Sequence, residues 1–354
     1  NKKIKQKKVK KVIVRYIIII ILLVCLIIVN LKPNKNLFSR ENFENKKKGM
    51  DLVLPKESTY EQHMKLAKEI QKNKTKYQKP IIWHSYWNGD LNEKHLICIR
   101  SCYYFNVLGY KNRKIILWLE KNTPNHYNQE IKKYAEIKEF NYDREIKDTI
   151  CAAQKFYLNR ENLPFYSDFI RTLLLLKYGG IWFDLDILFL KNMDCLFHKY
   201  GNRICVIAWE KQNYPNNAFY MCLQKNNPDM IHNIKFVMKQ NRGWGFQEAN
   251  LTFDKDLKML VLPCAWIDPA WIHSPIKIGF DEFFKASEEK WTFDNFHPGS
   301  FAFHWHNRWN MTIQENSIIL QLVKIIKNNL SILKNIEKVS VVIPTYNRFN
   351  YLLN

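Results

Sequence analysis

The sequence predicts an α/β fold, in which helices flank a central sheet, preceded by one transmembrane helix. From residue 79 onward, short apolar stretches rich in β-branched and aromatic residues alternate with longer amphipathic stretches, which is typical of alternating strands and helices. Apolar residues make up 47% of the 354 residues, which is enough for an enzyme-sized core and excludes a disordered chain. An apolar run at 12–29 predicts the membrane helix.

The first half of the globular part is expected to alternate regularly between strands and helices. Apolar runs bounded by polar or turn residues predict strands at 79–87, 114–120 and 178–190. Stretches with helical periodicity predict helices at 93–108, 127–138, 146–158 and 167–177. Gly179-Gly180 closes the last of these helices, because glycine accepts the backbone conformation that a helix end requires.

The second half continues the same alternation with less regular spacing. Further apolar runs predict strands at 204–210, 218–224, 259–263 and 300–306. Amphipathic periodicity predicts helices at 230–239 and 313–334. We place the globular domain at 79–312 and regard 313–338 as a helical linker.

The N-terminal region is expected to anchor this domain to a membrane. Residues 1–11 form a basic tail, residues 12–29 a transmembrane signal anchor, and the Lys/Asn-rich residues 30–78 a stem with one helix at 60–72. Lysines ahead of the span stay in the cytosol by the positive-inside rule, so the domain faces the lumen of a Golgi- or ER-like compartment or the exterior. A cleaved signal peptide is the alternative, but the small-residue cleavage site is missing.

Most of the positive charge also lies in this N-terminal region. About two thirds of the net charge of +22 lies in residues 1–79, so the globular domain is only mildly basic. This distribution favours a membrane surface and argues against nucleic acid as the partner. Seven cysteines follow the predicted anchor, without a spacing that defines their pairing or a metal cage.

Two aspartates in the stretch YGGIWFDLDILFL (178–190) require an explanation. In a strand, Asp184 and Asp186 point to one face with Trp182, while the apolar neighbours point to the other face. Two carboxylates at this spacing repel each other unless they are solvated, paired or bound to a cation. A hard ion such as Mn²⁺ or Mg²⁺ suits them, particularly if it also binds a diphosphate.

The residues before this pair make the pattern more specific. The run FYSDFIRTLLLLKYGGIWFDLD reads SD-x2-R-x7-GG-x3-D-x-D, which places Asp168 and Arg171 on one face of a helix. It resembles the sugar-transferase families with a DXD motif, which include α-1,4-galactosyltransferases, fungal initiating α-1,6-mannosyltransferases, capsular polysaccharide enzymes and, more distantly, glucosylating toxins. The resemblance extends loosely over 80–312. It implies a GT-A fold with a central mixed sheet and a retaining, metal-dependent transfer of a hexose from a nucleotide sugar, usually a UDP-sugar, to a glycan, glycoprotein or lipid.

The resemblance also implies roles for individual residues. Asp184 and Asp186 are the expected catalytic and metal-binding pair, with Asp186 ligating the ion directly. The expected substrate-binding residues are Trp83, Asn122, Asp168, Arg171, Trp182 and Asn217. Of these, Trp83 matches an aromatic position against the base, with a place in the core as the alternative, and Asn122 and Asn217 are weaker matches.

The stretch SFAFHWHNRWN (300–310) supplies the third expected metal ligand. His304 and His306 share a face of the predicted strand, and a neutral imidazole there can complete the site of the two aspartates. The resemblance maps a His-x-x-Asn segment onto His304 and Asn307, so we assign His304 as a ligand and keep His306 as the alternative.

Two other functions are compatible with parts of the sequence. A haloacid dehalogenase-like phosphatase also uses a strand followed by D-x-D, although there the motif opens the domain. A non-catalytic, membrane-tethered glycan-binding protein could keep the fold without turnover. Finally, VSVVIPTYNRFNYLLN (339–354) resembles the start of a family 2 glycosyltransferase domain, so we expect a truncated second module there.

Overall fold

The computed structural model describes residues 50–55, 57–121, 126–152, 163–208, 215–239, 257–272 and 274–341. The predicted tail and anchor and most of the C-terminal module lie outside these residues. Among the described helices, none combines the length and apolar character needed to cross a membrane.

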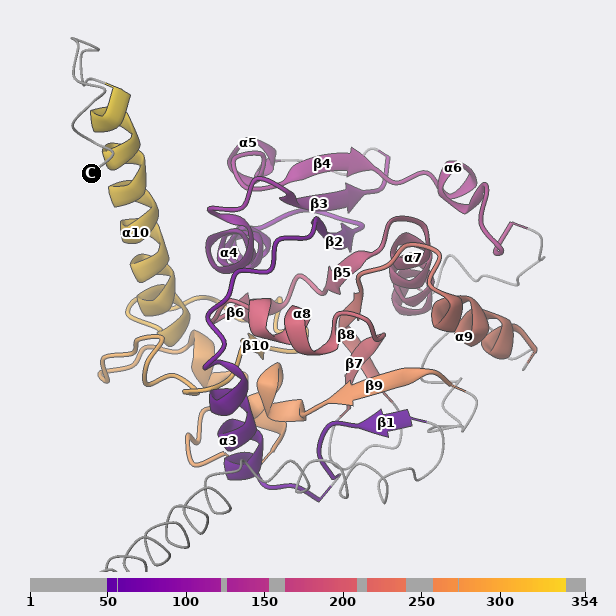
Figure 1. The fold of residues 1–354 in the computed structure, drawn as a ribbon. Helices are drawn as coiled ribbons and strands as arrows, with labels where there is room; N and C mark the ends of the chain where they lie inside the picture. Colours follow the sequence, from indigo (N-terminus) through magenta and orange to yellow (C-terminus); the bar gives the residue numbers. More distant parts are fainter. Residues whose placement is uncertain are drawn as a thin grey trace, which may run out of the picture. The chain divides into compact units, whose positions relative to one another are not determined.

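A mixed sheet of eight strands forms the centre of the described fold (Figure 1). In spatial order the strands are β1 (Met50–Leu52), β9 (Met259–Leu262), β7 (Cys205–Ala208), β8 (Pro215–Cys222), β5 (Gly180–Phe183), β2 (Ile81–Trp87), β3 (Arg113–Leu119) and β4 (Glu136–Glu139). Only β8 runs against the others, since it pairs antiparallel with both β5 and β7, whereas the remaining pairs are parallel. This confirms the predicted α/β class with a mixed sheet.

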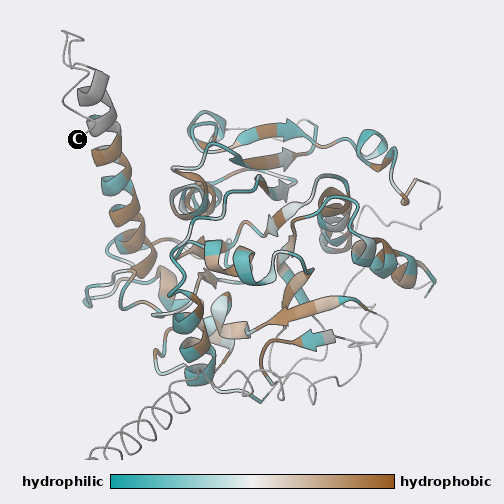
Figure 2. Ribbon diagram, viewed as in Figure 1, coloured by the Kyte–Doolittle hydropathy of each residue, from teal (hydrophilic) through white to brown (hydrophobic). Residues whose placement is uncertain are grey.

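Helices cover both faces of the sheet. One face is packed by α7 (Leu163–Tyr178) and α9 (Pro228–Lys239), with α6 (Tyr142–Ile146) beside them. The other face is packed by α3 (Tyr60–Ile70), α4 (Glu93–Cys102), α8 (Asp194–Tyr200) and the first turns of α10 (Ile318–Val341). Strand β9 is largely hydrophobic, whereas the edge strands β1 and β4 contain hydrophilic residues, and α10 alternates hydrophobic with hydrophilic residues, as a half-buried helix requires (Figure 2). The sheet is therefore buried on both sides.

The domain begins earlier and ends later than predicted. β1 lies within the predicted stem, yet it pairs in parallel with β9, and α3 buries Tyr60, Met64 and Ala67 in the core. α10 likewise buries Ile319 and Leu322, so its first half is part of the domain and not a linker. The elements against which β1 and α10 pack are distant from them in the sequence. Local composition therefore did not indicate that these two segments belong to the domain.

Several element predictions also need correction. The helix expected at 93–108 ends as a π-helical turn (Tyr103–Val107), and the helix expected at 127–138 is only α5 (Asn128–Ile131), followed by edge strand β4. The helix expected at 146–158 overlaps α6 only at Ile146, residues 147–152 form turns and a bend, and residues 153–158 lie outside the described residues. The strand expected from Val339 is wrong for its first residues, because α10 continues to Val341.

The most consequential correction concerns the strand predicted to run from Tyr178 to Leu190. It is two strands, β5 and β6 (Ile187–Phe189), separated by a turn at residues 184–186. β5 belongs to the large sheet, whereas β6 pairs antiparallel with β10 (Ala302–His304) in a separate two-stranded sheet. The chain thus leaves one sheet and enters another at the two aspartates.

Candidate functional site

The turn that carries the two aspartates is fixed from both sides. The Asp184 backbone N–H donates to the carbonyl of Ala218 at 2.8 Å, which is the last bond of the β5–β8 ladder. The Asp186 carbonyl accepts from the Trp305 N–H at 3.0 Å, beside the β6–β10 pair. Because each ladder ends at one aspartate, both residues lie outside regular strand geometry, in the turn that links the two sheets.

The glycine pair before β5 has a steric cause. Gly180 has φ +115°, and a Cβ built on it would lie 2.1 Å from the Ile82 carbonyl oxygen. Gly179 has φ +65°, and its carbonyl contacts the buried His84 ring at 3.1 Å. Only glycine fits this close approach of α7 to the sheet, which delivers the C-terminal end of β5 to the site.

Helix α7 and strand β8 contribute a cluster beside Asp184. The Arg171 Nη1 donates to the Asn217 Oδ1 at 2.5 Å and lies 3.4 Å from the Asp184 Oδ1. Its Nη2 lies 3.2 Å from the Asp168 Oδ1, which also accepts from the Asn217 amide at 3.1 Å. The structure therefore adds Asn217, which was predicted separately, to the Asp168, Arg171 and Asp184 of the single sequence motif. Their polar atoms converge on one point, an arrangement suited to a polyhydroxylated ligand.

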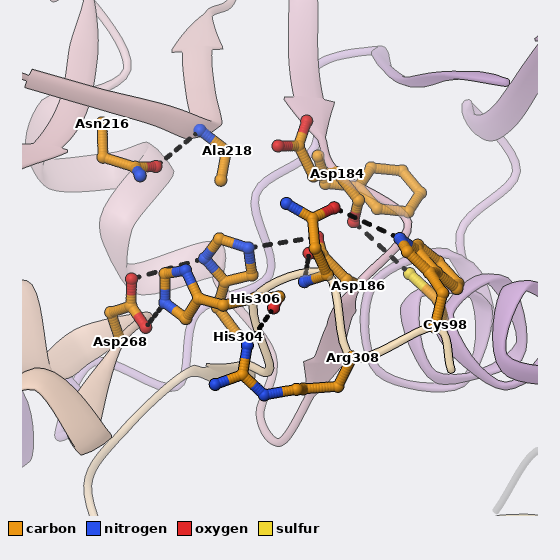
Figure 3. A network of polar contacts seen from close by, with 12 residues as sticks. Cys98, Asp184, Asp186, Asn216, Ala218, Asp268, His304, His306 and Arg308 are labelled. Atoms are coloured by element: carbon orange, nitrogen blue, oxygen red, sulfur yellow. Dashed lines mark hydrogen bonds and ion pairs between the residues drawn. The ribbon is translucent and has the colours of Figure 1, made fainter. Parts of the chain in front are cut away.

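A second run of contacts begins at Asp186 and leads away from Asp184 (Figure 3). The Asp186 Oδ1 lies 3.1 Å from the His304 Nε2, and the Asp186 Oδ2 accepts from the Asn307 backbone N–H at 2.8 Å. The other ring nitrogen of His304, Nδ1, lies 3.3 Å from the Asp268 Oδ2. The Asp268 Oδ1 in turn lies 2.7 Å from the His306 Nε2. His304 thus has one carboxylate at each of its nitrogens.

The charges of this run shift the pKa values of its members. The carboxylates of Asp186 and Asp268 raise the pKa of His304 well above its ordinary value, although burial acts in the opposite direction. Burial alone would raise the pKa of Asp186, but the His304 ring and its hydrogen bond lower it to about 2. The carboxylates of Asp184, Asp186 and Asp268 thus lie close together with few positive charges beside them. The site therefore attracts protons or other cations.

Asp184 differs from its partner. Burial raises the pKa of its carboxyl to about 6, Arg171 opposes this rise and the charge of Asp186 adds to it. Because 28% of the Asp184 side chain remains exposed, water weakens these influences. The exposed carboxylate is the member of the pair that a ligand can reach, whereas Asp186 is 3% exposed.

The residues present fit a divalent cation. Ligand atoms of Asp184, Asp186 and His304 lie within 4.8 Å of one another, and Asp268, His304 and His306 form a second such group that shares His304. Carboxylate oxygens with one imidazole suit Mn²⁺ or Mg²⁺. In the first group Asp268 holds the far nitrogen of the histidine, which is the usual outer-shell arrangement at a metal-binding histidine.

The comparison with known families agrees with this geometry. Residues 61–203 match the family described as "Glycosyltransferase sugar-binding region containing DXD motif". The match covers about two fifths of the chain and supports a glycosyltransferase with a DXD motif. The matched range includes α7, both glycines and the aspartate turn. No curated protein sequence matches the chain significantly.

Solved structures of several glycosyltransferases are similar to the enzyme. PaToxG glycosyltransferase has a TM-score of 0.35 and 16% identity, with 57% of this chain and 76% of that chain covered. Mouse xyloside xylosyltransferase 1 has a TM-score of 0.39 and 12% identity, with 66% and 100% covered. The galactosyltransferase LgtC, solved with donor and acceptor sugar analogs, has a TM-score of 0.35 and 10% identity, with 69% and 95% covered. The assignment of the enzyme rests on the family match and the site, not on these structures.

The two tryptophans predicted to bind substrate are buried. Trp83 is 0% exposed and packs edge-on against Phe183, Phe189 and Phe197, so the ring belongs to the core and cannot stack on a base in this structure. Trp182 is 1% exposed, and its indole N–H donates to the Asp184 Oδ1 at 2.7 Å. This hydrogen bond fixes the Asp184 carboxylate relative to β5. Asn122 lies outside the described residues.

Sequence reasoning missed two groups near the aspartates. Asp268 follows a short 3₁₀ turn in an apolar stretch, and nothing local distinguishes it from other acidic residues. Trp87 ends β2, four residues beyond Trp83, and its half-exposed ring packs against His95 and Trp309 at 4.3 and 4.9 Å. The end of a parallel strand is where ligands bind in α/β folds, and this signal could have identified Trp87 from sequence.

Proposed function

We propose that this enzyme has a GT-A-type fold and transfers a hexose from a nucleotide sugar, most simply a UDP-sugar, with the help of a divalent cation and with retention of configuration. The acceptor is a glycan, a glycoprotein or a lipid. The observation that carries the proposal is the meeting of Asp186 and His304, 118 positions apart in sequence, at the turn that presents Asp184.

Two groups of residues at this turn would have separate tasks, one in binding the cation and the other in binding the sugar. Asp186 and His304, with Asp184, would hold the cation, whose chemistry there is to neutralise the negative charge of a diphosphate leaving group. Arg171, Asp168 and Asn217 would bind sugar hydroxyls, because they offer donors and acceptors that are fixed by one another.

The transfer itself needs three changes at the anomeric carbon. The bond from this carbon to the diphosphate oxygen breaks, and the oxygen leaves with the electron pair. The acceptor hydroxyl oxygen bonds to the same carbon, and its proton would pass to the departing diphosphate oxygen. Orientation of the hydroxyls by the Arg171 cluster and burial of the charged groups would favour this reaction.

Neither alternative function gains support from the site. In the described residues, the Asp184 carboxylate contacts Trp182 and Arg171, and Asp186 is bonded to His304 and the Asn307 backbone. Such contacts hold a pair of metal ligands in place. We also propose that residues 12–29 anchor the enzyme with its domain on the lumenal side, which protease protection in sealed membranes would test.

The proposal is tested with a panel of UDP-, GDP- and CMP-sugars, with and without MnCl₂. We expect one donor to be hydrolysed slowly by the wild-type enzyme only when the metal is present. Asp186→Asn should lower this rate at least about a hundredfold while keeping the thermal unfolding midpoint. Asp51→Asn is the matched control, because it removes a half-exposed carboxylate paired with Arg203 at the sheet edge. Equal rates for Asp186→Asn and wild type would exclude the assigned role.

A further inference from the structure

A buried lysine contacts the loop that follows β10. Lys94 is the second residue of α4, and only 4% of it is exposed. Lysine is seldom buried to this extent, because removing its charge from water is costly unless polar groups surround it. Burial lowers the pKa of the Lys94 ammonium to about 8, so the group keeps its charge at neutral pH. A charge retained at this position requires an explanation.

The ammonium is held by the backbone of one loop. Its Nζ donates to the carbonyl oxygens of Trp309 at 3.2 Å and Met311 at 2.6 Å, and to that of Arg308. The centre of the Phe284 ring lies 4.2 Å from the same nitrogen. An ammonium has three N–H donors, so the three carbonyls can use all of them, and the ring face adds a cation–π contact. Lys94 thus ties the loop at residues 308–311 to the start of α4.

This loop reaches the proposed metal site through its backbone. The Asn307 N–H, which donates to the Asp186 Oδ2, belongs to the residue directly before Arg308. His306 and Asn307 have positive φ values, a conformation that is unfavourable for most residues other than glycine and persists only where surrounding contacts enforce it. Residues 305–311 belong to no helix or strand. The contacts of Lys94 with the carbonyls that follow directly therefore help to hold this backbone.

Helix α4 holds the aspartate turn as well. Cys98 lies one helical turn after Lys94, and its thiol donates to the Asp184 carbonyl at 3.6 Å (Figure 3). A capping box fixes the start of the helix: the Asn92 Oδ1 accepts from the Lys94 N–H at 3.0 Å, and the Asn92 N–H donates to the His95 Nδ1 at 2.9 Å. One helix therefore contacts the turn through Cys98 and the loop through Lys94, and so sets the position of one relative to the other.

We propose that Lys94 is a positioning residue: its ammonium holds the loop at 308–311 so that the Asn307 N–H stays on the Asp186 carboxylate, which then keeps the orientation that binds the cation. The inference rests on the proposed transferase function and adds a residue that acts only through Asp186. A lysine that merely stabilised the fold could be replaced by an apolar side chain without loss of metal affinity in the folded protein.

The test compares Mn²⁺ affinities by titration calorimetry, at a temperature at which circular dichroism shows every variant to be folded. Lys94→Met keeps an unbranched side chain but removes the charge and the donors. Lys94→Gln keeps N–H donors without the charge and takes the place of Lys94→Met if that variant does not fold. Lys114→Met is the matched control, because the Lys114 side chain is half exposed and paired with Glu136 beside the edge strand β4.

A second comparison restores the missing group. Lys94→Ala lacks the three methylene groups and the ammonium beyond Cβ, which together correspond to n-propylammonium. This cation is added to the variant, with 1-propanol as its uncharged counterpart. Because only the cation can donate to all three carbonyls, recovery by n-propylammonium alone separates positioning by the charge from simple filling of the space.

We expect Lys94→Met to bind Mn²⁺ at least about fivefold more weakly than wild type, Lys94→Gln to lose less, and Lys114→Met to stay within about twofold of wild type. n-Propylammonium should strengthen Mn²⁺ binding by Lys94→Ala at least about threefold, whereas 1-propanol should not. Wild-type affinity in Lys94→Met, or equal effects of the amine and the alcohol on Lys94→Ala, would overturn the inference.

Donor hydrolysis by the wild-type enzyme, measured in parallel, separates this inference from the proposed function. If the wild-type enzyme binds Mn²⁺ but hydrolyses no donor, only the proposed function is contradicted. If it binds no Mn²⁺, the metal site and this role of Lys94 are both wrong.

Discussion

Replacement of Asp268 tests whether this buried carboxylate prepares His304 for the metal. Asp268 is 0% exposed and faces the His304 Nδ1 with one oxygen and the His306 Nε2 with the other. With a proton fixed on Nδ1, the lone pair of the His304 Nε2 is left toward Asp186 and an ion. Asp268 would then act through His304, as a positioning residue.

The size of the effect follows from the hydrogen bond. In Asp268→Asn the amide oxygen can still accept from the His304 Nδ1, but the bond changes from charge-assisted to neutral, which costs about 1–1.5 kcal/mol. We therefore expect about tenfold weaker Mn²⁺ binding. Asp268→Ala leaves a buried N–H without its acceptor, which costs about 1–3 kcal/mol in addition to the lost charge, so about a hundredfold loss is expected.

The assay is titration calorimetry of the purified protein with MnCl₂, without any sugar donor, so that it does not depend on turnover. Thermal unfolding of each variant shows whether the fold is kept. The control Asp51→Asn removes a carboxylate outside the site and should bind Mn²⁺ within about twofold of wild type. If Asp268→Asn and Asp268→Ala both bind Mn²⁺ with wild-type affinity, then Asp268 has no part in presenting His304.

Three further outcomes are expected. Gly180→Ala should lower the free energy of unfolding by at least about 3 kcal/mol in urea titrations, because its Cβ would meet the Ile82 carbonyl at 2.1 Å and φ is +115°; a loss under about 1 kcal/mol would contradict the packing. Arg171→Lys keeps the charge but loses the planar fork, so donor turnover should fall at least about tenfold with Mn²⁺ affinity retained; unchanged turnover would refute the proposed contact. Burial lowers the pKa of both His63 and His84 to about 4; the unfolded chain binds more protons below pH 6.5, so each of these side chains contributes stability that is present above that pH and falls by about 1.5 kcal/mol between pH 6.5 and 5. Thermal unfolding across this range should show a fall that is about 1.5 kcal/mol smaller in His84→Gln than in wild type, and an equal fall in the two proteins would contradict the assignment.

The sequence was sufficient to identify the elements that local patterns determine. Helix α7, the glycine pair and the approach of Asp168 and Arg171 to Asp184 all lie within about 20 consecutive residues, where spacing in a helix and a turn fixes the geometry. The mixed character of the sheet came from family resemblance. Periodicity alone could not have shown that β8 runs against its neighbours.

Predictions that depended on distant partners were less successful. The rule that strand residues alternate faces placed Asp184 and Asp186 side by side, but the rule holds only while one ladder continues. Here β5 pairs with β8 up to Phe183, whereas the pairing of β6 with β10 starts only at Ile187. The partner of β6 lies more than a hundred residues downstream, and no local pattern indicates it.

The same limit explains the choice between Trp83 and Trp87. Both lie on the same face of β2, since they are four residues apart, so alternation cannot separate them. What separates them is position along the strand: Trp83 lies in mid-strand, beneath packed phenylalanines, and Trp87 at the strand end. Burial is decided by the elements that cover the strand, which single-sequence patterns do not reveal.

His304 and His306 lie close together, as predicted, although the backbone that carries them is not a continuous strand. They were expected to share a face of one strand, but β10 ends at His304, and His306 and Asn307 have positive φ values of 52° and 54°. This backbone turns the chain so that the Asn307 N–H reaches Asp186 while His306 reaches Asp268. The two histidine rings therefore contact the two oxygens of the same carboxylate, that of Asp268. Because Asp268 contacts both rings, a shift of the turn that carries it would move His304 and His306 together.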